Sequence, residues 1–99
     1  NEQEIKTICA YSQEFLSEPG RKWPKYHFNQ RSYARWAAAE LVNLISDHPF
    51  VSADITVEKF IIQCSYYADC FSENTKQNLM FSVARDVASD ILDILRAMK

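Results

Sequence analysis

The sequence predicts an all-α fold, a small antiparallel bundle of four helices, and three observations lead to it. One glycine and three prolines in 99 residues leave long stretches without a helix breaker. Apolar residues within those stretches recur every three or four positions, which is the period of a helix face, and do not alternate as in a strand. The length suits one hydrophobic core, so we expect a single helical domain over residues 1–99.

The first two helices are expected at about residues 2–17 and 30–47, separated by a long linker at 17–30. Two acidic residues near the chain start favour a helix N-terminus, and Pro19-Gly20 ends that helix. The second helix carries an alanine-rich face, which allows close packing, and ends before His48-Pro49.

The third helix is expected at about 56–72, capped by Asp54 or Thr56. Its predicted core face consists of Val57, Phe60, Ile61, Cys64, Tyr67, Ala68 and Phe71. Two further apolar residues, Ile62 and Tyr66, stand one turn apart on the otherwise polar side. They indicate either local packing or an interface.

The fourth helix is expected at about 75–98, capped by Asn74 or Thr75. Its apolar positions follow a heptad pattern from Met80 to Met98. Phe81, Leu92 and Leu95 widen the apolar face beyond what one neighbouring helix covers. We therefore expect this helix either to be central in the bundle or to share that face with a second copy of the chain, as in a homodimer.

The segment 21–36 combines basic and aromatic residues and contains no acidic residue. Cations that follow phosphates and rings that stack on bases are typical of proteins that bind single-stranded nucleic acid. The simpler interpretation is that the aromatic residues anchor the linker to the bundle while the cations stay in solvent. If an anion binds here, the expected contacts are Arg21, Lys22, Trp23, Lys25, Arg31, Arg35 and Trp36.

Two of these residues carry specific expectations. Arg31 and Arg35 are one turn apart, so both guanidinium groups are expected on the same edge of the second helix near its N-terminus. Trp36 projects away from the alanine face, and either the linker covers it or it contacts a partner. The net charge of the chain, -2, argues against strong nonspecific binding to nucleic acid.

No catalytic or cofactor site is predicted. A single glycine excludes phosphate-binding loops built on glycine, and two histidines without a Cys-x-x-Cys motif give no zinc ligand set. Asp86, Asp90 and Asp93 form a stripe of carboxylates that we interpret as a solvated helix flank. A docking surface for a basic segment and a site for a divalent cation are the less favoured alternatives. A small helical ribonuclease using Arg21 and His27, or a metal-dependent hydrolase, remains a minor alternative.

The expected function is that of a small non-enzymatic protein-interaction or assembly module, whose partner is another protein or a second copy of itself. The alternative is single-stranded nucleic-acid binding through residues 21–36. Three cysteines cannot all pair within one chain and no signal peptide is recognisable, so we expect reduced thiols and a cytoplasmic location. No apolar run is long enough to cross a bilayer, so no membrane association is expected.

Overall fold

A computed structural model describes residues 2–15 and 28–98. These residues form four helices and no strand: α1 (Glu2–Phe15), α2 (Phe28–Asp47), α3 (Ala53–Cys70) and α4 (Lys76–Ala97). The all-α, four-helix prediction is therefore confirmed. Most of the expected 17–30 linker lies outside the described residues.

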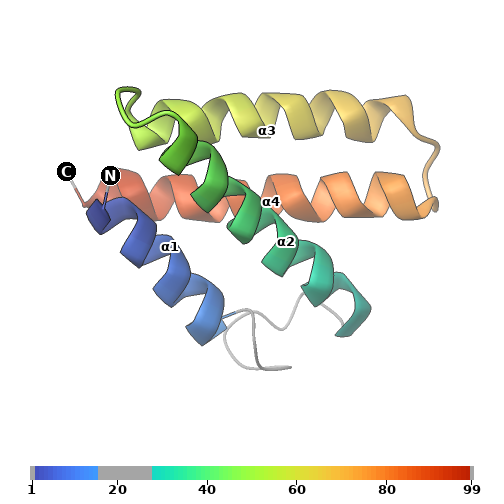
Figure 1. Ribbon diagram of the computed structural model, residues 1–99. Helices are drawn as coiled ribbons and strands as arrows, with labels where there is room; N and C mark the ends of the chain where they lie inside the picture. Colours follow the sequence, from blue (N-terminus) through green and yellow to red (C-terminus); the bar gives the residue numbers. More distant parts are fainter. Residues whose placement is uncertain (1, 16–27, 99) are drawn as a thin grey trace.

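Helices α3 and α4 form an antiparallel pair, and α1 and α2 lie obliquely across it (Figure 1). The fourth helix packs against all three others. Its residues Val87, Ala88 and Ile91 are fully enclosed, together with the alanine-rich face of α2. Of the two expectations for α4, the central position is the one observed.

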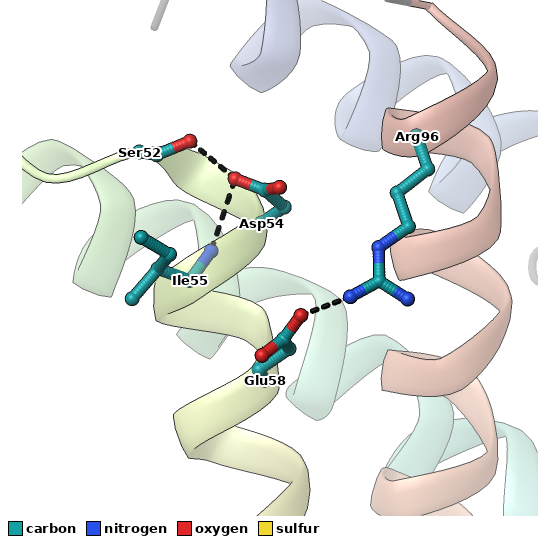
Figure 2. Close-up of polar contacts among 5 residues, drawn as sticks. All are labelled: Ser52, Asp54, Ile55, Glu58 and Arg96. Carbon is teal, nitrogen blue, oxygen red and sulfur yellow. Dashed lines mark hydrogen bonds and ion pairs between the residues drawn. The ribbon is translucent and has the colours of Figure 1, made fainter.

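The start of α3 lies earlier than the sequence predicts. Ser52 is the N-cap, and the helix begins at Ala53. Asp54 therefore lies within the first turn, where its carboxylate accepts a hydrogen bond from the Ile55 amide at 3.1 Å and another from the Ser52 hydroxyl (Figure 2). The carboxylate satisfies one of the free amides of that turn, which is why an acidic residue is favourable there.

The start of α4 agrees with its predicted cap. Thr75 has extended backbone, and its hydroxyl accepts a hydrogen bond from the Asn78 amide at 3.1 Å. The preceding residue, Asn74, has a φ of 73°, a left-handed conformation that asparagine tolerates better than most residues. This turn reverses the chain so that α4 runs back along α3.

Candidate interaction surface

Four aromatic side chains lie in contact where α3 ends and α4 begins. The rings of Tyr66 and Tyr67 meet edge to face at a centroid distance of 5.6 Å. Tyr67 lies 5.2 Å from Phe81, which in turn stacks on Phe71 at 6.1 Å with an interplanar angle of 10°. The two tyrosines and Phe71 are exposed, and Phe81 is half-buried. We call these four residues the aromatic cluster.

Helix α3 also carries apolar residues directly opposite its core face. Ile55, Ile62 and Tyr66 are exposed, and at ~100° per residue they point ~180° away from the buried side chains of Val57 and Cys64. Ile62 is 69% exposed and Tyr66 is 66% exposed. We call these three residues the apolar strip.

The packing of the bundle explains why the apolar strip is uncovered. Helix α3 lies at an edge of the molecule and packs mainly against α4 and, to a smaller extent, α2 (Figure 1). Neither neighbour reaches its outer side. Contiguous exposed apolar groups of this kind mark interaction surfaces more often than isolated ones do.

Not all of the expected interface residues lie on this surface. Ile62, Tyr66 and Phe81 belong to it, but Leu92 and Leu95 are buried in the core by the other helices of the same chain. Because α4 is central, its broad apolar face needs no second copy to cover it. Leu92 and Leu95 are therefore corrected from interface to core residues.

Two members of the aromatic cluster were expected in the core. Tyr67 and Phe71 satisfy the helical period of the core face, yet both are exposed. The helix ends at Cys70 and Phe71 has extended backbone, so this end of α3 lies beyond the main core, where the two rings pack against the half-buried Phe81. Periodicity predicts which face of a helix a side chain lies on. It does not predict over what length of that face a neighbouring helix packs.

The predicted basic segment is only partly described by the structure. Arg21, Lys22, Trp23 and Lys25, and with them the Arg21–His27 pair, lie outside the described residues. Arg35 is exposed, whereas Arg31 is only 5% exposed.

The expectation of a shared edge for Arg31 and Arg35 is therefore wrong. Arg31 precedes the buried residues Ala34 and Ala38 by three and seven positions, which places it on the core face of α2. Arg35 is turned a further ~40° away from that face. One helical turn of spacing was enough to separate a buried guanidinium from an exposed one.

Trp36 is 40% exposed, and α3 contributes to its cover. Its ring lies 6.4 Å from that of Phe60, with the planes tilted by 46°. The predicted cover of this ring was the linker or a partner, and the contact with α3 was not predicted.

A shallow groove of about 340 Å³ runs between α1 and α2. Its apolar floor includes Ile8, Ala38 and Val42, and the exposed residues Cys9 and Arg35 lie along it. The groove is open to solvent, and the small side chains of Ala38 and Ala39 form part of its α2 side.

Two observations on the described residues concern nucleophiles and metal ligands. Cys64 is buried, and this desolvation raises the pKa of its thiol to about 11, only partly opposed by the charge of Arg85. The thiol therefore stays protonated at neutral pH and is a poor nucleophile. Within residues 2–15 and 28–98, no three His, Cys, Asp or Glu side chains gather in a way that could hold a metal ion.

Searches against protein families, curated proteins and solved structures found no match. Among the described helices, none combines the length and apolar character that a membrane span needs.

Proposed function

We propose that this protein is a non-enzymatic interaction module that binds another protein chain through the outer side of α3. The observation that carries the proposal is the continuity of the apolar strip with the aromatic cluster. The two groups share Tyr66, so exposed apolar side chains run from Ile62 in the middle of α3 to Tyr67 and Phe71 at its end.

The composition of this surface favours a protein partner. Tyrosine and phenylalanine are enriched in the centres of protein interfaces, where they supply large contact areas at a small cost in side-chain entropy. The described part of the surface contains no concentration of cations that would suit a nucleic acid, and Lys59 is the cation closest to Ile62 in sequence.

The exposed thiols of Cys9 and Cys70 are free, which supports a reducing, cytoplasmic setting.

Site-specific photo-cross-linking in cells of the source organism tests the proposal. A photoreactive phenylalanine analogue at Ile62 is expected to form a protein adduct, because this side chain lies at the centre of the proposed surface. The matched control places the same analogue at Ser46, which is exposed on α2 and away from the apolar strip. Equal labelling at both positions, or none at Ile62, would contradict the proposal.

A further inference from the structure

We propose that the partner of α3 is a second copy of the chain, which pairs with it as an antiparallel helix across a two-fold axis. This inference rests on the proposed function and names its partner. It is carried by the order of charged and apolar residues along the outer side of α3.

Four exposed residues follow one another along that side at intervals of three and four positions, like the a and d positions of a coiled coil. We call them the contact face: Lys59, Ile62, Tyr66 and Asp69. The two apolar residues are in the middle, with a cation at one end and an anion at the other.

This order is self-complementary when the second helix is antiparallel. The midpoint between Ile62 and Tyr66 is also the midpoint between Lys59 and Asp69. A two-fold axis through it packs each Ile62 on the Tyr66 of the partner subunit and sets each Lys59 opposite the Asp69 of the partner subunit. A parallel pair would instead place like charges side by side at both ends.

The two charged residues are available for this pairing. Neither Lys59 nor Asp69 has an ion pair or hydrogen bond from its side chain to another part of the described chain. Ten positions separate them on one helix, which is ~15 Å, so they do not pair within one chain. The neighbouring Glu58, by contrast, is already paired with Arg96 (Figure 2).

The contact is small. Four residues per chain cover about three turns of helix, and such an area falls below the ~1,200 Å² of a typical stable interface. We therefore expect a reversible dimer with a Kd of roughly 10–1,000 µM. Its affinity should fall as salt is added, because the end pairs are exposed.

A charge exchange tests the pairing. Sedimentation velocity of the full chain at up to about 1 mM is compared for the wild type, Lys59→Asp, Asp69→Lys and the double variant. Each single variant sets like charges against each other at both ends and is expected to weaken the dimer about tenfold or more. The double variant restores opposite charges and is expected to return to within about threefold of the wild type. Circular dichroism serves as the folding control.

Cross-linking tests the direction of the helices. In a Cys9→Ala, Cys70→Ala background, Gln63→Cys brings two thiols close to the axis, so a short bis-maleimide is expected to join two chains. In a Cys9→Ala background the native Cys70 is ~21 Å or more from its counterpart in an antiparallel pair and should not be joined. Cross-linking at Cys70 in preference to Gln63→Cys would overturn the antiparallel arrangement.

The outcomes separate this inference from the proposed function. A wild type that is monomeric at all concentrations, or a double variant that is no better than the single variants, overturns the antiparallel pair. The photo-cross-link at Ile62 is independent of that result. An adduct with a different protein, together with a monomeric chain, would overturn self-pairing and support the proposed function.

Discussion

The side-chain amide of Asn78 donates a hydrogen bond to the backbone carbonyl of Ala68 at 2.8 Å, and so ties the first turn of α4 to the last turn of α3. The same nitrogen lies 3.2 Å from the carbonyl of Phe71. The Ala68 carbonyl also accepts a hydrogen bond from the Phe71 amide at 3.3 Å, so the Asn78 amide is its second donor. Carbonyls near the end of a helix lack donors within the helix, which is why a donor from α4 is favourable at Phe71. This contact fixes the end of α3 that carries the aromatic cluster.

Replacing Asn78 should therefore destabilise the hairpin. Asn78→Ala removes the donor and should lower the free energy of unfolding by about 1–2 kcal/mol. Asn78→Asp should cost more, because its carboxylate faces two carbonyl oxygens. Urea unfolding followed by circular dichroism measures both, with Gln77→Ala, at an exposed neighbouring position, as the control. A loss no greater than that of the control would show that the contact contributes nothing.

The buried thiol of Cys64 should make the free energy of unfolding decrease at alkaline pH. Its pKa is about 11 in the folded chain, against 9.0 as the ordinary value, so folding favours the protonated thiol. This contribution is fully present below pH 9 and is lost as the pH rises through 11. Stability should thus fall between pH 9 and 11, and fall less steeply in Cys64→Ala. Parallel pH profiles of the two proteins would contradict the assignment.

The same burial predicts the order of thiol labelling. In the folded chain at pH 8, a disulfide reagent should modify the exposed Cys9 and Cys70, and should reach Cys64 only on unfolding. The reagent releases one thiolate for each cysteine that it modifies, so measuring the released thiolate before and after adding urea gives the number of accessible cysteines. Fast modification of all three thiols in the native protein would contradict the burial of Cys64.

Much of the fold could be predicted from the sequence because the breakers and the period of the apolar residues are local signals. The boundary between α2 and α3 follows from His48-Pro49, and the cap at Thr75 was recognisable from its residue type. The start of α3 was missed because Asp54 can act either as a cap or as a first-turn anion. Only the chain geometry around Ser52 distinguishes these roles.

The candidate surface was less predictable, because the exposure of its residues depends on which helix faces pack against each other in the bundle. Ile62 and Tyr66 could be identified as out of place on a polar face. The burial of Leu92 and Leu95 follows from the central position of α4, which the sequence offered only as one of two alternatives. Likewise, the depth of Arg31 depends on how closely α2 approaches its neighbours.

The ion pair between Glu58 and Arg96 joins α3 to the end of α4, and it should matter little for stability (Figure 2). Both side chains are about half exposed, so solvent screens their attraction. Glu58→Gln should lower the free energy of unfolding by less than about 1 kcal/mol, and the difference should shrink in high salt. Urea unfolding at low and high salt measures it, and a large, salt-independent loss would contradict an exposed pair.

The contrast between Leu92 and Ile62 tests the assignment of core and surface. Leu92 is buried among the helices of its own chain, so Leu92→Ala should leave a cavity and lower the free energy of unfolding by about 2–4 kcal/mol. Ile62 is similar in size but exposed, and Ile62→Ala should change the stability of the monomer by no more than about 0.5 kcal/mol. Urea unfolding at low micromolar concentration, where the proposed dimer is dissociated, compares the two.

The same Ile62→Ala variant should weaken self-association at high protein concentration while leaving the fold intact. A large loss of monomer stability in Ile62→Ala would instead mean that this side chain supports the bundle, and would remove it from the contact face.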